Sequence, residues 1–328
     1  MLVLAGCGGE ETTSPFPGSY LYALSPAQQS VSRYSLPSAA LIPDLFATGA
    51  QPVDLAVRLG KGYVLDAAER SLRVFATSDG TALANAPLGD TASPVRVFPY
   101  ADTVAYVTDS ATGSLLVVDP KAGALTRTIA LGGTPAAMAV ALSKVYVTNT
   151  HYDPVTDTYG TGTVSIVGIG SNTVLKTINV GPVPLALVAD DKGWVHVLAA
   201  GPGDAQSHVY RINARYDVVV GSPIPLGGHA NDLVLGQDVL VYAPASASLS
   251  LGTPAGVIVY DWETGSLIRA GDNPVPVGPN PVSAVALRDK IVAIADGGAL
   301  GDVYVIDESL SSAPLAAFSR EITRLAAE

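Results

Sequence analysis

The chain repeats a unit of four short β-strands, and its clearest copy is Lys144–Val188. Runs of β-branched or alternating residues at 144–149, 163–167, 173–178 and 185–188 are separated by Gly, Pro, Asn and Asp. Such runs bounded by turn residues are typical of consecutive antiparallel strands. A unit that recurs about every 40 residues must bury its surfaces against its neighbours, which indicates a repeat architecture.

The second strand of the unit is the easiest to follow along the chain. It is found at Tyr20–Leu24, Tyr63–Asp66, Val104–Asp109, Val145–Asn149, Val195–Leu198, Val239–Tyr242 and Ile291–Ile294. Seven copies predict seven units, and no stretch of ten or more residues has a helical period.

One unit is divided between the two ends of the chain. The sequence starts on a second strand, at Tyr20, whereas the seventh copy of the first strand is at the C-terminus, where Ser319–Ala326 aligns with Gly49–Ala56. A divided unit is completed when the array closes into a ring. We therefore expect an all-β fold over residues 19–328. The expected fold is a seven-bladed β-propeller of four-stranded antiparallel blades, in which the C-terminal strand joins the N-terminal blade and closes the ring.

The composition excludes several classes of protein. Hydrophobic residues make up 48% of the chain and charged residues 14%, which is too apolar for a disordered protein. The net charge is −11, and no run of Lys or Arg interrupts it. Nucleic acids and anionic membrane surfaces are therefore poor partners.

The single cysteine, Cys7, follows Leu4-Ala5-Gly6. This tetrapeptide resembles a bacterial lipobox, in which the cysteine is lipidated and becomes the mature N-terminus. Residues 1–7 are then a truncated lipoprotein signal, since only six residues precede the cysteine, and residues 8–18 are a flexible tether. The alternative is a chance tetrapeptide in a protein that is not exported. No run approaches the ~20 apolar residues of a membrane span, so we expect membrane attachment through lipid alone, at the bacterial cell envelope, either periplasmic or at the cell surface.

Three features together resemble the YVTN family of β-propeller repeat proteins. They are the tetrapeptide Tyr146-Val147-Thr148-Asn149 with its near copy at 106–109, the Gly-x-x-Pro junctions such as Gly49–Pro52, and the Asp-x-x-Thr-Gly turn at 261–265. The resemblance implies a propeller over most of the chain and a place in the envelope, without a common chemistry.

The loops that follow the later second strands are longer than a turn requires, and the richest is His151–Gly160. It carries an imidazole, two phenols and two carboxylates, which suit a cation, a carbohydrate or a basic peptide. The ligand-binding residues predicted here are His151, Tyr152, Asp153, Asp157 and Tyr159. Because Asp153 and Asp157 lack the alternate spacing of a calcium loop and Asp is a common turn former, an ordinary surface turn remains the alternative.

A second group, His229 and Asp232, lies at a junction that a propeller places near its channel. These residues would either bind a ligand or cap the junction turn. The polar residues Asp54, Arg96, Ser283 and Arg324, on first strands, are expected to line the channel itself.

No catalytic residue is predicted. Four histidines and one cysteine are too few for a multi-histidine copper site or a haem attachment, and no Gly-x-Ser-x-Gly elbow occurs. We expect a non-catalytic binding or scaffolding module without a cofactor, with calcium as the one possible exception. Its partner would be a protein, carbohydrate or small ligand on the face of the long loops. A propeller hydrolase or lactonase with an acidic or calcium site at the channel mouth, and a structural surface-layer component, are the alternatives.

Overall fold

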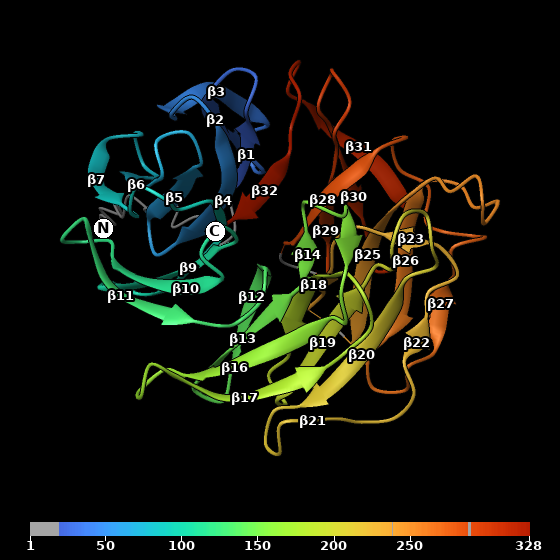
Figure 1. The fold of residues 1–328 in the computed structure, drawn as a ribbon. Coiled ribbons are helices and arrows are strands. Elements are labelled where there is room, and N and C mark those ends of the chain that lie inside the picture. Colours follow the sequence, from blue (N-terminus) through green and yellow to red (C-terminus); the bar gives the residue numbers. More distant parts are fainter. Residues whose placement is uncertain (1–19, 238, 288–289) are drawn as a thin grey trace, which may run out of the picture.

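The computed structural model describes residues 20–237, 239–287 and 290–328. Its strands form seven antiparallel blade sheets, each with a first strand at the central axis and a fourth strand at the rim (Figure 1), and one separate two-stranded hairpin. No helix occurs in these residues, and so none is long and apolar enough to cross a membrane. The seven-bladed propeller predicted from the repeats is confirmed.

The first four blades are regular. From the axis outward, blade 1 contains β32 (Arg324–Ala327), β1 (Tyr20–Ser25), β2 (Ser30–Ser35) and β3 (Ala40–Ala47). Blade 2 contains β4 (Pro52–Arg58), β5 (Lys61–Asp66), β6 (Ser71–Ala76) and β7 (Ala82–Pro87). Blade 3 contains β8 (Pro94–Ala101), β9 (Val104–Asp109), β10 (Ser114–Asp119) and β11 (Ala124–Ala130). Blade 4 contains β12 (Pro135–Ala141), β13 (Lys144–Asn149), β16 (Thr163–Gly168) and β17 (Thr173–Asn179), with a separate hairpin of β14 (Tyr152–Asp153) and β15 (Thr158–Tyr159).

The last three blades are less regular. Blade 5 contains β18 (Pro184–Ala189), β19 (Trp194–Ala199), β20 (His208–Asn213) and a divided outer strand, β21 (Val218–Val219) and β22 (Ile224–Pro225). Blade 6 has a divided inner strand, β23 (His229–Ala230) and β24 (Val234–Leu235), followed by β25 (Leu240–Ser246), β26 (Gly256–Asp261) and β27 (Leu267–Arg269). Blade 7 contains β28 (Pro281–Ala286), β29 (Val292–Asp296), β30 (Asp302–Ile306) and β31 (Ser312–Ala317).

The inner strand of blade 6 differs from the continuous strand that the sequence predicts at 232–235. Its pairing with β25 stops after Ala230↔Ala245 and resumes at Val234↔Tyr242, so the break lies opposite Pro244. Proline has no N–H to donate, which interrupts the hydrogen-bond ladder at that point. Asn231 of the segment between β23 and β24 still donates its N–H to the Pro244 carbonyl at 2.8 Å, and regular pairing is absent from Asp232 and Leu233.

The ring closes through the C-terminal strand, as predicted. β32 pairs antiparallel with β1 over Leu21↔Ala327 to Leu24↔Arg324, and Figure 1 shows β32 beside β1 in blade 1. Apolar side chains of the described residues form seven buried clusters, one between each pair of neighbouring blades, including the pair of blades 7 and 1. The hydrophobic core is therefore a ring of blade interfaces rather than a single centre.

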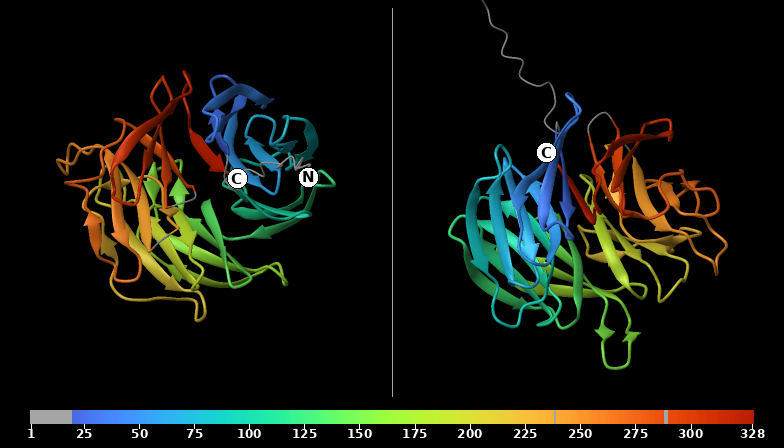
Figure 2. Two further views of the ribbon diagram at one scale, coloured as in Figure 1. Left: turned by 180° about the vertical axis from the view of Figure 1, so that it is seen from behind. Right: turned by 90° about the horizontal axis from the view of Figure 1, so that it is seen from above.

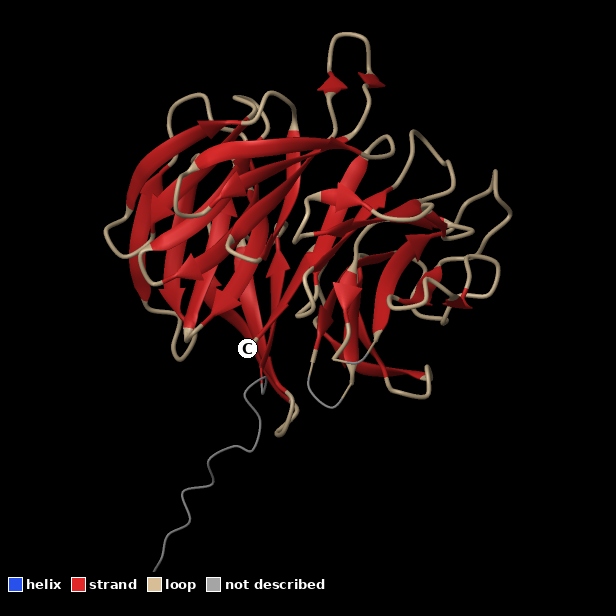
Figure 3. Ribbon diagram, turned by 90° about the horizontal axis from the view of Figure 1, so that it is seen from below, coloured by secondary structure: helices blue, strands red, loops and turns tan. Residues whose placement is uncertain are grey.

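One face of the ring carries both the turns that follow the second strands and the junctions that precede the first strands; we call it the loop face. The hairpin β14–β15 projects from this face, and the C-terminus lies on the opposite side (Figure 2, right; Figure 3). This arrangement places the longest predicted loop beside the Gly-x-x-Pro junctions.

Candidate functional site

The tetrapeptide at 146–149 builds the blade rather than a site. The buried Tyr146 hydroxyl donates to Asp217 Oδ1 at 2.6 Å, which ties blade 4 to blade 5 on the face opposite the hairpin. Burial and the hydrogen bond to Asp217 raise the pKa of Tyr146 far above its usual value, so the phenol stays protonated. Thr148 Oγ1 accepts from the Ala137 N–H at 2.9 Å, and the Asn149 amide donates to Ser165 Oγ at 2.9 Å. All three polar side chains are committed to structural hydrogen bonds.

A buried carboxylate at the end of the second strand holds the turns of the loop face in three blades. Asp109 accepts from the Ser93 N–H of the preceding junction at 2.7 Å and from the Thr112 hydroxyl of the following turn at 2.5 Å. Asp66 and Asp296 occupy the same place in blades 2 and 7. The first glycine of the junction makes this contact feasible, since a Cβ on Gly49 would lie 2.1 Å from Asp66 Oδ2. The recurrence of an acidic residue at this position is the sequence signal that could have revealed these contacts.

The hairpin β14–β15 brings together the five residues predicted in blade 4. Tyr152 and Tyr159 form a cross-strand pair whose ring centroids are 5.0 Å apart. The Tyr152 hydroxyl donates to Asp157 Oδ1 at 3.0 Å, and His151 Nε2 lies 2.9 Å from Thr163 Oγ1 at the base of the hairpin. The predicted loop is thus an ordered arm with its own hydrogen bonds.

Both carboxylates of the hairpin are engaged within it. Asp153 Oδ1 accepts from the Val155 N–H at 2.9 Å, and this hydrogen bond lowers the pKa of Asp153. The hydrogen bond that Asp157 accepts raises the pKa of Tyr152. These contacts are those of an Asx turn and a phenol–carboxylate pair, so the hairpin presents an aromatic surface with its charges partly satisfied.

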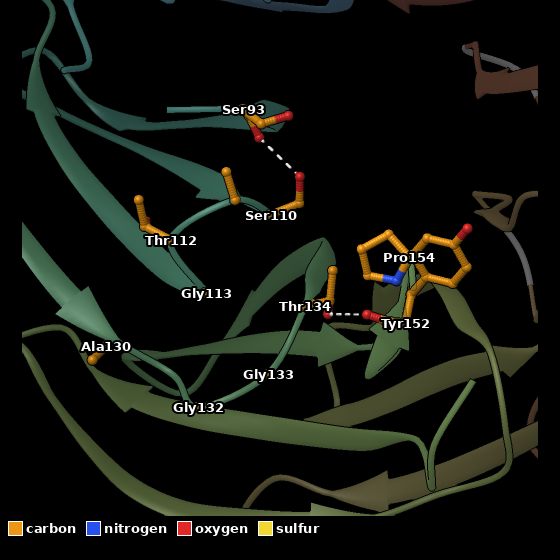
Figure 4. Close-up of a pocket in the computed structure, with 11 residues that line it drawn as sticks. Ser93, Ser110, Thr112, Gly113, Ala130, Gly132, Gly133, Thr134, Tyr152 and Pro154 are labelled. Carbon is orange, nitrogen blue, oxygen red and sulfur yellow. Dashed lines mark hydrogen bonds between the residues drawn. The ribbon is translucent and has the colours of Figure 1, made fainter. Parts of the chain in front are cut away.

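A pocket of about 680 Å³ lies between the base of this hairpin and the loop-face turns of blade 3; we call it the hairpin pocket. In Figure 4, Tyr152 and Pro154 stand on one side of it and Ser93 and Ser110 on the other. The residues that line it are Ser93, Ser110, Ala111, Thr112, Gly113, Ala130, Gly132, Gly133, Thr134, Tyr152 and Pro154.

The lining of the hairpin pocket combines polar and apolar groups and carries no charged side chain. Four hydroxyls come from two junctions and one turn, and a phenol ring comes from the hairpin. Two of the hydroxyls hold the rim together, because Ser110 Oγ donates to the Ser93 carbonyl at 3.1 Å and Thr134 Oγ1 to the Tyr152 carbonyl at 3.4 Å. Hydroxyls retain acceptor and donor capacity after one such bond, so the site suits a neutral ligand rich in hydrogen-bonding groups.

A second group of polar side chains meets in the channel; we call Asp54, Arg96, Asp232 and Arg324 the channel cluster. Arg324 of β32 donates from Nε to Asp54 Oδ1 at 2.8 Å and from an Nη to Asp232 Oδ2 at 3.2 Å. Arg96 of β8 lies 3.7 Å from Asp54. Three of the four channel residues predicted from the sequence are in this cluster. The fourth, Ser283, is buried and accepts from the Leu325 N–H at 3.2 Å.

The residues predicted near the channel mouth separate from one another. Asp232 enters the channel cluster, whereas His229 Nδ1 lies 3.1 Å from the Ala205 carbonyl in the neighbouring turn. Neither is in contact with the hairpin, so the predicted site residues form two groups rather than one. The partnership of Asp232 with Arg324 was missed in the sequence because the two residues are 92 positions apart.

The remaining predictions concern metals and Cys7. Among the described residues, no group of three or more His, Cys, Asp or Glu could hold a metal ion, so calcium stays a prediction without a site in the described residues. Cys7 and the tether at 8–18 lie outside the described residues.

Comparison with known proteins supports the assignment of the fold but does not indicate a function. No family model and no curated protein matches the chain. Among solved structures, it is similar to a functionally unknown protein from Desulfotomaculum acetoxidans, with a TM-score of 0.68 and 11% identity over 94% of this chain and 98% of that one. Hydrazine synthase of Kuenenia stuttgartiensis matches with a TM-score of 0.62 and 15% identity over 94% and 98%. A streptogramin B lyase matches with a TM-score of 0.62 and 12% identity over 91% and 88%. At these identities the likeness shows the propeller alone.

Proposed function

We propose that the protein is a non-catalytic binding module of the YVTN type, anchored in the bacterial envelope by lipid at Cys7, and that it binds a carbohydrate in the hairpin pocket. A propeller supports a binding or scaffolding module and also a propeller enzyme, as the similarity to a lyase illustrates. The choice between them therefore depends on the sites.

The observation that supports the carbohydrate is the lining of the hairpin pocket. Sugars present many hydroxyls and one apolar ring face, and the pocket offers Ser93, Ser110, Thr112 and Thr134 around the ring of Tyr152. A cation or a basic peptide would require free carboxylates. Asp153 and Asp157 each have one oxygen bonded within the hairpin, and neither residue lines the pocket.

The channel cluster gives less support to an enzyme. Asp54 accepts from Arg324 and from the Val97 N–H at 2.8 Å, so both of its oxygens are occupied. Asp232 likewise accepts from Arg324 and from the Leu233 N–H at 2.9 Å. A general base needs a lone pair directed at its substrate, and every oxygen of these two carboxylates already directs one lone pair at a donor of the protein.

Isothermal titration of the protein with maltotriose, cellotriose and chitotriose tests the carbohydrate. We expect at least one neutral trisaccharide to bind, and Tyr152→Ala to weaken it about tenfold, because an aromatic contact contributes about 1 kcal/mol and its loss also opens one wall. Tyr216→Ala is the matched control, since Tyr216 is 67% exposed and belongs to the turn that carries Asp217 on the opposite face. Absence of binding to all three sugars, or equal effects of the two substitutions, would overturn the proposal.

The envelope anchor has a separate test. The protein is expressed in a bacterium from a gene with a complete lipoprotein signal, and the mass of the mature N-terminal peptide is measured. We expect Cys7 to carry the lipid and Cys7→Ser to release the protein from the membrane fraction. An unmodified thiol would contradict the anchor without bearing on the hairpin pocket.

A further inference from the structure

The channel contains a cavity of about 210 Å³ with two unlike walls. One wall is the channel cluster, contributed by blades 1, 2, 3 and 6. Apolar residues of several blades complete the lining, and on the side of blades 4 and 5, where the lining carries no charged residue, they include Met138 of β12 and Leu185 and Leu187 of β18. A cavity that is charged on one side and apolar on the other suits a ligand with the same division.

The cluster contains two positive and two negative side chains. Its hydrogen-bond acceptors and donors, however, are not used to the same extent. Each oxygen of Asp54 and Asp232 already accepts one hydrogen bond, from Arg324 or from a backbone N–H. An arginine carries five N–H donors. Arg324 uses one from Nε and one from an Nη in the described structure. Every carboxylate oxygen of the cluster thus has a hydrogen-bond partner, whereas several arginine N–H donors have none among the described residues.

Arg96 holds most of these remaining donors. Within the described residues, its guanidinium makes one long hydrogen bond, 3.4 Å to the carbonyl of the adjacent Val95. The nearest carboxylate oxygen, Asp54 Oδ1, is 3.7 Å away and belongs to Arg324 at 2.8 Å. The Arg96 side chain is 31% exposed and lines the cavity. A ligand in the channel can therefore reach its free N–H groups. Burial and the neighbouring charge of Arg324 lower the pKa of Arg96, and an anion placed beside it would relieve both effects.

We infer that the channel is a binding site for a small organic carboxylate, whose carboxylate pairs with the guanidinium of Arg96 and whose apolar part packs against Met138 and Leu185. Two parallel N–H···O bonds between a guanidinium and a carboxylate give such a site geometric specificity as well as energy. A dry cavity of about 150 Å³ accepts benzene, so a cavity of about 210 Å³ has room for a molecule of the size of benzoate. This site is independent of the hairpin pocket and of the carbohydrate proposed there.

Benzoate is the probe, with benzyl alcohol and benzylamine as neutral and cationic analogues of the same shape. We expect benzoate to raise the melting temperature in a dose-dependent way and to give a binding isotherm by titration calorimetry. Benzyl alcohol should bind at least about tenfold more weakly, since it cannot make the charged pair, and benzylamine should not bind. Equal binding of benzoate and benzyl alcohol would overturn the inference, as would no binding of benzoate.

Substitution of the arginine locates the site. Arg96→Met should reduce benzoate affinity at least about tenfold, and Arg96→Lys should retain part of it, because lysine keeps the charge without the planar fork. Arg127→Met is the matched control, since Arg127 is exposed on the outer strand β11 of the same blade. Should Arg96→Met fail to fold, the ratio of benzoate to benzyl alcohol in Arg96→Lys decides, and an unchanged ratio contradicts the pairing. Tyr152→Ala should leave benzoate binding unchanged, which separates this site from the hairpin pocket.

Discussion

Blades 1 and 3 have the same order of strands, but their inner strands are held in different ways. In blade 3, β8 continues through a short loop into β9 and pairs with it from Pro94↔Asp109 to Ala101↔Val104. In blade 1, β32 arrives from the other end of the chain and pairs with β1 over four residues. The inner strand of blade 1 is therefore shorter and has no covalent link to its neighbour.

In blade 1, charged side chains provide links to neighbouring strands and blades that the chain connectivity does not provide. Arg324 reaches Asp54 in blade 2 and Asp232 in blade 6. The Glu328 carboxylate accepts from the Gly60 N–H and from the Thr77 hydroxyl, and Arg320 donates to Asp44 at 2.7 Å. Blade 3 instead relies on Asp109, whose partners all lie within the blade or its junction. The comparison indicates that ion pairs to other blades supplement the short pairing of β32 in blade 1, whereas Asp109 holds the turns of blade 3 through local hydrogen bonds.

Deleting Glu321–Glu328 should have the largest effect, because it removes the closing strand altogether. The deletion exposes the pairing edge of β1 and removes the buried Ile322 and Leu325, each worth about 1.5–3 kcal/mol. With the lost ion pairs, we expect destabilisation of at least about 5 kcal/mol or failure to fold, measured by urea denaturation. A truncated protein that melts at the wild-type temperature and stays monomeric would contradict closure through this segment.

A circular permutant provides the control for that deletion. The Glu328 N–H already lies 3.4 Å from the Tyr20 carbonyl, so an Asn-Gly turn can join the two residues. New ends between Asp102 and Thr103 then make blade 3 the divided blade. We expect this permutant to fold with a stability within about 1 kcal/mol of the wild type, since it only moves the break in the chain.

Arg324→Met tests whether ion pairs contribute to closure beyond the pairing of β32. It leaves the 2% exposed carboxylate of Asp54 without its arginine, and breaking a buried pair in this way costs about 3 kcal/mol. Adding Asp54→Asn should recover part of the loss, because an amide carries no charge to desolvate. A loss below about 1 kcal/mol would mean that strand pairing alone closes the ring.

Asp109→Ala is the counterpart in blade 3. The carboxylate is 1% exposed and accepts from the Ser93 and Ala111 N–H groups and from the Thr112 hydroxyl. We expect a loss of about 2 kcal/mol, because the hydrogen bonds to the carboxylate are lost. The loss is no larger because the freed backbone groups at this surface can bind water. Asp119→Ala, which removes a carboxylate from the Lys121 turn on the opposite face, should cost less than half as much. Equal losses would show that Asp109 has no special role.

Replacing 153–158 with Asn-Gly should have the smallest effect on stability. The change keeps the Tyr152↔Tyr159 pair and the contact of His151 with Thr163, and it leaves β13 and β16 paired. We expect the free energy of unfolding to change by less than about 0.5 kcal/mol, while sugar binding weakens through the loss of Pro154. Unfolding of the shortened protein would show that the hairpin is structural.

Local sequence predicted the strands well because their signals are local. Alternation of apolar residues at Val104–Asp109 and Val145–Asn149, and glycines before prolines, describe each strand and turn without reference to the rest of the chain. The order of the units also identified the closing strand. The division of the inner strand of blade 6 was not predicted, since it is visible only in the pairing of this strand with β25.

The grouping of the candidate site residues in space was predicted only in part. Residues 151–159 were identified as one loop because they are adjacent in the chain, but Ser93 and Ser110 join them only across a blade interface. Asp54 and Arg324 were each expected to line the channel, but their pairing with one another was not predicted.

The sequence by itself therefore determined the blades, their number and the closure of the ring, since repeats, turns and strand periodicity are properties of neighbouring residues. Only the tertiary structure decided which polar groups face one another. Asp54 and Arg324 are 270 positions apart, and closing the ring is what brings an arginine from one end of the chain to a carboxylate near the other.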